Sequence, residues 1–147
     1  MSGVICAIRG GPHSQPTIDC ALNLAIEHNC TLHFLYVVNL EFLARTSLSR
    51  VDTISKEMHY MGEFIMLATQ TAAEKRGVKA SGVVREGDVS EEIIALCHET
   101  GATYVVVGKP HTKIEENVFT NDLLQQFSDR IEKETGARVV YPEAGLP

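Results

Sequence analysis

Short apolar runs alternate with amphipathic helical patterns along most of the chain. The apolar runs occupy residues 4–8, 31–38, 78–86, 103–107 and 137–141. Nearly continuous apolarity is typical of parallel strands that are covered on both faces, whereas the intervening spacings of three and four indicate helices. This alternation predicts an α/β fold: one domain over residues 1–147 with a single doubly wound, mostly parallel five-stranded sheet and helices on both faces.

Two of the expected helices have apolar faces that follow from residue spacing. The first covers residues 14–29 and would bury Ile18, Leu22, Ala25 and Ile26. The second follows a stretch of unclear period at residues 39–53 and would end before Gly77. Its apolar stripe consists of Ile54, Met58, Met61, Ile65, Ala68 and Ala72. The methionines of this stripe are expected to fill the core.

The other two helices are marked by their ends. Asp88 followed by Glu91 resembles a capping box at the start of the third helix, which would end at Gly101. The fourth helix would end at Gly136. Its apolar face consists of Phe119, Leu123, Phe127 and Ile131.

Composition and charge exclude several classes of partner. Hydrophobic residues make up 44% of the 147-residue chain and charged residues 22%, as in ordinary globular proteins. The net charge is −6 and the basic residues are scattered, which argues against nucleic acid. No apolar stretch approaches the ~20 residues of a membrane span, and no export signal is visible at the N-terminus. We therefore expect a cytoplasmic protein without a nucleic-acid or membrane partner.

The cysteines and histidines show no metal-binding pattern. Cys6, Cys20, Cys30 and Cys97 form neither a CxxC pair nor a zinc-ligand spacing. They are expected to be reduced thiols, so no metal site is assigned.

Two loops share the pattern Gly-x-Pro-His-(Ser/Thr), at residues 10–14 and 108–112. Each follows one of the apolar runs. Turn chemistry alone can explain the pattern, because glycine, proline, serine and threonine all favour turns. A shared binding site is the alternative explanation.

From Val4 to Pro142 the chain resembles the universal stress protein family. The stretch VICAIRGGPHS looks like the family's opening strand and turn. The most specific match is GVVREGDVSEEIIALCHETGATYVVVGKP, which looks like the third strand, a helix and the fourth strand. The resemblance implies strand order 3-2-1-4-5, with a topological switch point between the first and fourth strands. Open α/β sheets bind ligands at such points, so the two histidine-bearing loops would face one another there.

The family's usual way of binding ATP is not expected to carry over. The resemblance implies that ATP-binding members carry Gly-x2-Gly-x9-Gly-(Ser/Thr) after the fourth strand. Gly108 fills the first position, whereas His111, Asn121 and Asp122 stand at the other three. The carboxylate of Asp122 would repel a terminal phosphate, and Arg9 replaces an acidic residue of ATP-binding members.

The same crevice could take a small anion or a differently posed nucleotide. Its cationic side chains attract negative charge, and its glycines allow close backbone approach. The candidate ligand-binding residues are Arg9, Gly10, Gly11, His13, Val38, Gly108, Lys109, His111, Asn121 and Asp122. The alternative is that these residues are solvated parts of ordinary turns.

The expected function is that of a small binding or regulatory domain that needs no cofactor. Two alternatives stay open: an ATP- or AMP-binding stress regulator with a degenerate phosphate loop, and a weak nucleotide hydrolase. Ser14 with His13 or His111 could serve the latter, but no spacing establishes a catalytic residue.

The resemblance also implies a homodimer in which the final strand pairs with its counterpart. Val139, Val140 and Tyr141 would form the contact, because an exposed apolar edge is a template for strand pairing. The alternative is a monomer in which Arg138 and Pro142 blunt a short strand.

Overall fold

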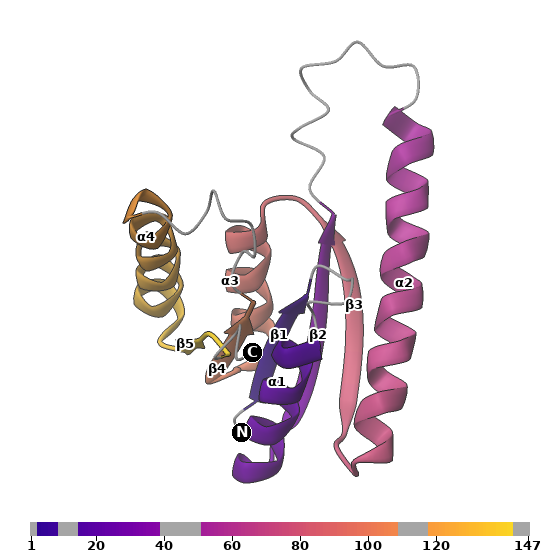
Figure 1. The fold of residues 1–147 in the computed structure, drawn as a ribbon, viewed down its shortest axis with the longest axis horizontal. Helices are drawn as coiled ribbons and strands as arrows, with labels where there is room; N and C mark the ends of the chain where they lie inside the picture. The colour runs from indigo at the N-terminus through magenta and orange to yellow at the C-terminus, as the bar shows by residue number, and fades with distance from the viewer. Residues whose placement is uncertain (1–2, 9–14, 39–50, 109–117, 143–147) are drawn as a thin grey trace.

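A computed structural model of the chain describes residues 3–8, 15–38, 51–108 and 118–142 (Figure 1). In chain order the elements are β1 (Gly3–Ile8), α1 (Gln15–His28), β2 (Thr31–Val38), α2 (Val51–Lys75), β3 (Ala80–Glu86), α3 (Val89–Thr100), β4 (Tyr104–Val107), α4 (Val118–Thr135) and β5 (Arg138–Val140). The strands form one five-stranded sheet in the order β3-β2-β1-β4-β5, and every neighbouring pair is parallel. The expected fold class and strand order are confirmed.

The last three strands are shorter than the apolar runs that predicted them. Val78 and Ala137 are buried just before β3 and β5, although neither belongs to a strand. Burial therefore extends beyond the paired strand residues into the connecting turns. An apolar run in the sequence predicts which residues are buried, and the strand itself is shorter than that run.

The core consists of two apolar clusters, one on each face of the sheet. Along β1 the side chains alternate: Val4 and Cys6 join the cluster beneath α1 and α2, whereas Ile5 and Ala7 join the cluster beneath α3 and α4. All six residues of β1 are buried. This central strand lies between β2 and β4, which explains why its sequence is apolar at nearly every position.

The ends of α3 follow the expected capping chemistry. Asp88 is the N-cap residue, and its Oδ2 accepts a hydrogen bond from the backbone N–H of Glu91 at 3.0 Å. Gly101 ends the helix in the left-handed region, with φ 71°, and its N–H donates to the carbonyl oxygen of Cys97 at 2.8 Å. The N-cap at Asp88 and the end at Gly101 are confirmed, whereas the carboxylate of Glu91 lies 4.0 Å from Nη2 of Arg130.

The expected buried face of α1 was partly wrong. Ile26 is 48% exposed, whereas Thr17 and Ala21 are buried beside Ile18 and Leu22. Threonine is polar and alanine is small, so neither stands out as a buried residue in the sequence. The prediction relied on the larger apolar residues, and it therefore included Ile26 and left out Thr17 and Ala21.

The stripe expected on α2 was partly right: Met58 and Ile65 pack against the core, but the stripe was not centred on the buried row. Met61 and Ala68 are exposed, and Met61 did not prove to be core filler. The buried row instead consists of Gly62, Met66, Thr69 and Ala73. Glycine has no side chain and threonine is polar, so neither stands out in an apolar pattern. The buried hydroxyl of Thr69 donates to the carbonyl oxygen of Met66 at 2.9 Å, which satisfies it within the helix.

Two glycines let α2 lie close against the sheet. A Cβ atom at Gly62 would lie 2.5 Å from Cδ2 of Tyr36 on β2, and one at Gly82 on β3 would lie 2.9 Å from Cβ of Met66. Both distances are far below ordinary carbon–carbon contact. At Gly62 the backbone of α2 therefore packs against a side chain of β2, and at Gly82 the backbone of β3 packs against a side chain of α2.

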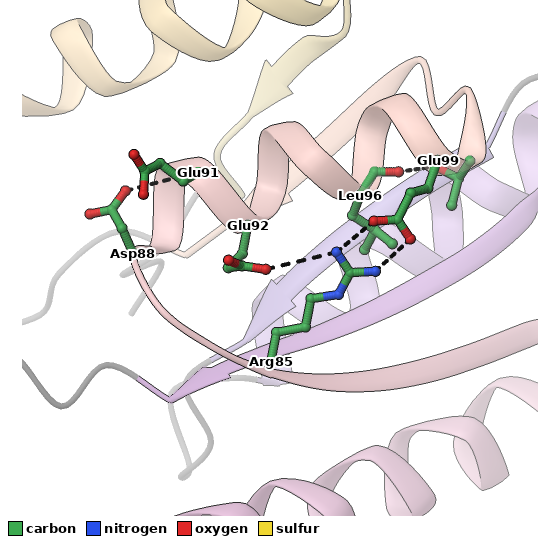
Figure 2. Close-up of polar contacts among 7 residues, drawn as sticks. Arg85, Asp88, Glu91, Glu92, Leu96 and Glu99 are labelled. Atoms are coloured by element: carbon green, nitrogen blue, oxygen red, sulfur yellow. Dashed lines mark hydrogen bonds and ion pairs between the residues drawn. The ribbon is translucent and has the colours of Figure 1, made fainter.

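A guanidinium ties β3 to α3 on the other face of the sheet (Figure 2). Arg85 donates from Nη1 and Nη2 to the two carboxylate oxygens of Glu99, at 2.8 and 2.6 Å, and Nη1 lies 3.8 Å from Oε1 of Glu92. The hydrogen bond from Arg85 lowers the pKa of Glu99, and the same bond raises the pKa of Arg85. This two-pronged contact holds the end of β3 in register with the helix that follows it.

Candidate functional site

The switch point of the sheet lies between β1 and β4. Ala7 pairs with Val107 near the carboxyl ends of these parallel strands, so the two strands end side by side. The chain continues from β1 into α1 on one face and from β4 into α4 on the other. Strand ends that diverge in this way leave the crevice where open α/β sheets bind ligands.

Six of the candidate ligand-binding residues lie outside the described residues: Arg9, Gly10, Gly11, His13, Lys109 and His111. Asn121 and Asp122 belong to the N-terminal part of α4. Val38 and Gly108 are described, at the ends of β2 and β4. The strands that precede the two histidine-bearing loops are thus neighbours, while the loops themselves fall in the undescribed segments.

Gly108 packs tightly against α1. A Cβ atom at this position would lie 2.7 Å from Oγ1 of Thr17, a residue only 3% exposed. The Thr17 side chain therefore packs against the backbone of Gly108, and only glycine leaves room for this contact. Sequence reasoning singled out Gly108 but missed Thr17. The four-residue spacing of Thr17, Ala21 and Ala25 was the signal that could have revealed it.

Val38, a predicted site residue, is engaged in the fold through both its side chain and its backbone. Its side chain is fully buried, and its carbonyl oxygen accepts a hydrogen bond from the N–H of Gly87 at 3.0 Å. Gly87 has φ 148°, and a Cβ atom there would lie 2.9 Å from Oε2 of Glu92. A glycine is needed at this position for the chain to pass from β3 to α3 against β2.

The thiols near the site are not poised as nucleophiles. Burial raises the pKa of Cys6 on β1, and burial also raises the pKa of Cys20 on α1. The Sγ–H of Cys6 points to the carbonyl oxygen of Thr17 at 3.9 Å. Because the thiolate is the reactive form, these two side chains belong to the packing beneath α1 rather than to chemistry.

A serine, a histidine and a glutamate meet where β3 ends beneath α2. Oε1 of Glu86 accepts a hydrogen bond from Oγ of Ser55 at 3.2 Å and lies 3.2 Å from Nε2 of His59. A catalytic triad requires the histidine between the serine and the carboxylate, whereas here the carboxylate contacts both. The cluster links α2 to β3 and does not activate Ser55.

The described residues contain neither a metal-binding cluster nor a membrane-spanning helix. Within the ranges that the structure covers, no three His, Cys, Asp or Glu side chains are placed to hold a metal ion. None of the described helices is long and apolar enough to cross a membrane.

The fold defines the chain as an open, doubly wound α/β protein whose topological switch point lies between β1 and β4. The sequence matches the universal stress protein family over residues 1–127. The chain belongs to this family, as its sequence resemblance had implied.

Comparison with known proteins agrees. The chain is 27% identical over 113 residues to universal stress protein YxiE of Bacillus subtilis (strain 168), covering 71% of this chain and 76% of that protein. A universal stress protein family structure from Burkholderia pseudomallei has a TM-score of 0.73 and 21% identity, with 96% of both chains covered. A universal stress protein solved in complex with cAMP has a TM-score of 0.70 and 16% identity, with 98% of both chains covered.

Proposed function

We propose that this chain is a small regulatory binding protein whose carboxyl edge takes an anionic ligand, with single-phosphate nucleotides as the class to test first. It acts by binding rather than by turnover, and the usual ATP-binding mode of the family is lost. The four free cysteines fit a reducing, cytoplasmic setting.

The observation that carries the proposal is a glycine at the switch point. Gly108 directly follows β4, next to the end of β1, and is partly exposed; a Cβ atom there would meet Oγ1 of Thr17 at 2.7 Å, so the close packing requires glycine. Backbone N–H groups that a ligand can approach closely are typical of phosphate-binding turns. A structural relative was solved with cAMP, which carries one phosphate.

The residues at the start of α4 disfavour a triphosphate. Asn121 and Asp122 lie there in place of the glycine and hydroxyl residue of ATP-binding members. A carboxylate near a helix N-terminus stabilises the helix, but it repels the third phosphate of ATP. A single phosphate near β4 does not have to extend toward Asp122.

Calorimetry with AMP, cAMP and magnesium ATP tests the function. We expect AMP or cAMP to bind at least tenfold more tightly than ATP, which is about 1.4 kcal/mol of binding free energy. Inorganic phosphate is the control for a site that binds the phosphate group and makes no contact with the nucleobase. An ATP dissociation constant in the low micromolar range corresponds to a binding free energy of about −8 kcal/mol. Such a value would show that the protein still binds triphosphate, through groups other than the family motif. Failure of all four probes to bind would reject the ligand proposal.

We also propose that the chain forms a homodimer through β5. Among the described residues β5 pairs with β4 alone, so its outer side is an edge. The N–H of Val139 on this edge donates to Oε2 of Glu132 at 2.9 Å. Pairing with a second β5 must replace this bond, which makes Glu132 a competitor for the dimer contact formed by Val139, Val140 and Tyr141.

Two substitutions on this edge should shift the molecular mass in opposite directions. Val140→Lys should yield monomers by placing a charge in the contact, whereas Glu132→Ala should favour the dimer by freeing the Val139 N–H. Light scattering measures both, with Ile26→Lys on the exposed side of α1 as the control. If the protein is a dimer and neither Val140→Lys nor Glu132→Ala changes its mass, β5 is excluded as the dimer contact.

A further inference from the structure

Thr17, in the first turn of α1, carries a buried hydroxyl group whose hydrogen bonding differs from that of the other buried hydroxyls. Three polar side chains of the described residues are buried: Thr17 is 3% exposed, Thr69 5% and Ser128 8%. Oγ1 of Thr69 donates to the carbonyl oxygen of Met66, and Oγ of Ser128 donates to that of Leu124. Within the described part of the chain, no group forms a hydrogen bond with the hydroxyl of Thr17.

The position of Thr17 in its helix explains this difference. A threonine within a helix commonly donates to a carbonyl oxygen of the preceding turn, as Thr71, Thr100 and Thr135 do in this protein. Because α1 begins at Gln15, no helical turn precedes Thr17. No fully enclosed side-chain oxygen or nitrogen of the described residues lacks a hydrogen-bond partner. Oγ1 of Thr17 therefore keeps some accessible surface, through which a ligand can reach it.

Thr17 lies over the switch point, beside both strands that end there. Its backbone carbonyl oxygen is 3.9 Å from Sγ of Cys6 on β1, and Cys6 pairs with Val106 on β4. Its Oγ1 faces Gly108, because a Cβ atom at that glycine would lie 2.7 Å from it. The hydroxyl thus points from the first turn of α1 toward the partly exposed backbone that follows β4.

The first turn of α1 supplies further hydrogen-bond donors next to this hydroxyl. Backbone N–H groups at a helix start have no partner within the helix, and the positive end of the helix dipole attracts anions. Pro16 has no N–H, so the donors of this turn are those of Gln15 and Thr17. The turn contains no acidic residue. The exposed Asp19 follows it, and its Oδ1 accepts a hydrogen bond from Nε2 of Gln15 at 2.9 Å.

We propose that the first turn of α1 anchors the phosphate group of the ligand, through the Thr17 hydroxyl and the N–H groups of Gln15 and Thr17, beside Gly108. This role rests on the proposed function, because it gives the phosphate of that ligand its place on the carboxyl edge. A hydroxyl and several N–H groups at a helix start match the acceptor oxygens of one phosphate.

This anchor lies on the face of the sheet opposite α4. α1 packs against the cluster that contains Val4 and Cys6, whereas α4 packs against the cluster that contains Ile5 and Ala7. A phosphate held by α1 does not need the glycine and hydroxyl residues that α4 lacks. The anchor therefore explains how a single phosphate binds where the motif for triphosphate is lost.

Calorimetry on threonine variants tests the anchor. Thr17→Val removes the hydroxyl and keeps the branched shape, so it should weaken both AMP and inorganic phosphate about fivefold, the effect of one lost hydrogen bond. Adenosine carries no phosphate, so its affinity should not change. Thr17→Ser keeps the hydroxyl and should bind AMP within about twofold of the unmodified chain. Thr69→Val removes a buried hydroxyl on α2 and is the matched control, which should leave AMP binding unchanged.

Two further measurements separate a ligand anchor from a structural hydroxyl. Thermal unfolding of the ligand-free protein should show an unchanged or raised Tm for Thr17→Val, because a buried hydroxyl without a partner does not stabilise the fold. In ¹⁵N-labelled protein, inorganic phosphate should shift the amide signals of Gln15 and Thr17. The amide signals of Ser90 and Glu91 should stay in place, because Asp88 already caps the start of α3.

The outcomes distinguish this anchor from the proposed function. If AMP binds the unmodified chain and Thr17→Val equally well, the anchor is wrong and the nucleotide function stands. If neither AMP nor inorganic phosphate binds the unmodified chain, both are rejected. An equal loss of adenosine affinity, a clear drop in Tm, or equal shifts at the starts of α1 and α3 would also overturn the role of Thr17. Thr17→Ala removes the same hydroxyl, so it can relieve a clash at Gly108 only in part.

Discussion

Replacing Gly62 with alanine should lower the free energy of unfolding by about 2 kcal/mol, although alanine is the better helix former. The added Cβ atom would lie 2.5 Å from Cδ2 of Tyr36 and 3.0 Å from Cγ2 of Val84. Tyr36 is only 6% exposed, so its ring has little space to move. Overpacking of this kind costs up to about 3 kcal/mol, whereas the gain in helix propensity is about 1 kcal/mol. The clash therefore outweighs the propensity.

Urea unfolding of matched variants measures this balance. Thr71→Ala on the exposed side of the same helix carries the propensity gain without the clash, so it should stabilise the protein by a few tenths of a kcal/mol. Tyr36→Leu shortens the side chain that blocks the new methyl group. In that background Gly62→Ala should cost less than in the unmodified chain, as a coupled pair requires. A stabilising effect of Gly62→Ala alone would mean that α2 does not approach β2 this closely.

The second expected result concerns the switch point: Gly108→Ala should weaken nucleotide binding at least tenfold. The new Cβ atom would lie 2.7 Å from Oγ1 of the buried Thr17, so either the end of β4 or the start of α1 must shift. Any ligand group that approaches the backbone at Gly108 meets both the methyl group and the displaced chain. A tenfold loss corresponds to about 1.4 kcal/mol.

A rescue variant and a distant glycine sharpen the test. Thr17→Ala removes Oγ1 and leaves Cβ as the nearest side-chain atom, at 3.9 Å, so Gly108→Ala with Thr17→Ala should recover part of the binding. Gly3→Ala is the control at the amino end of the same sheet, where the nearest atom is 3.4 Å away. Calorimetry measures the dissociation constant of AMP for all three variants. Equal affinities for Gly108→Ala and the unmodified chain would remove Gly108 from the site.

The elements themselves could be predicted from local chemistry. The apolar residues of β1 mark a strand covered on both faces, and Asp88 and Gly101 mark the two ends of α3. Such signals act through neighbours in the chain, so they are present before the chain folds. The order of the strands could not be predicted from local chemistry, because β1 pairs with β4, which lies nearly a hundred residues further along the chain. That order was available only through resemblance to a family.

What tertiary structure alone decided is which row of α2 faces the core. The sequence by itself determined a three-four repeat, but it did not reveal the row of Gly62, Met66, Thr69 and Ala73, because glycine and threonine carry no apolar signal. The choice depends on Gly62 fitting against Tyr36, a contact between elements that no local pattern records. At the switch point, likewise, Gly108 could be recognised from its motif. Its contact with Thr17 exists only because α1 packs against both β1 and β4, which brings two segments distant in sequence together.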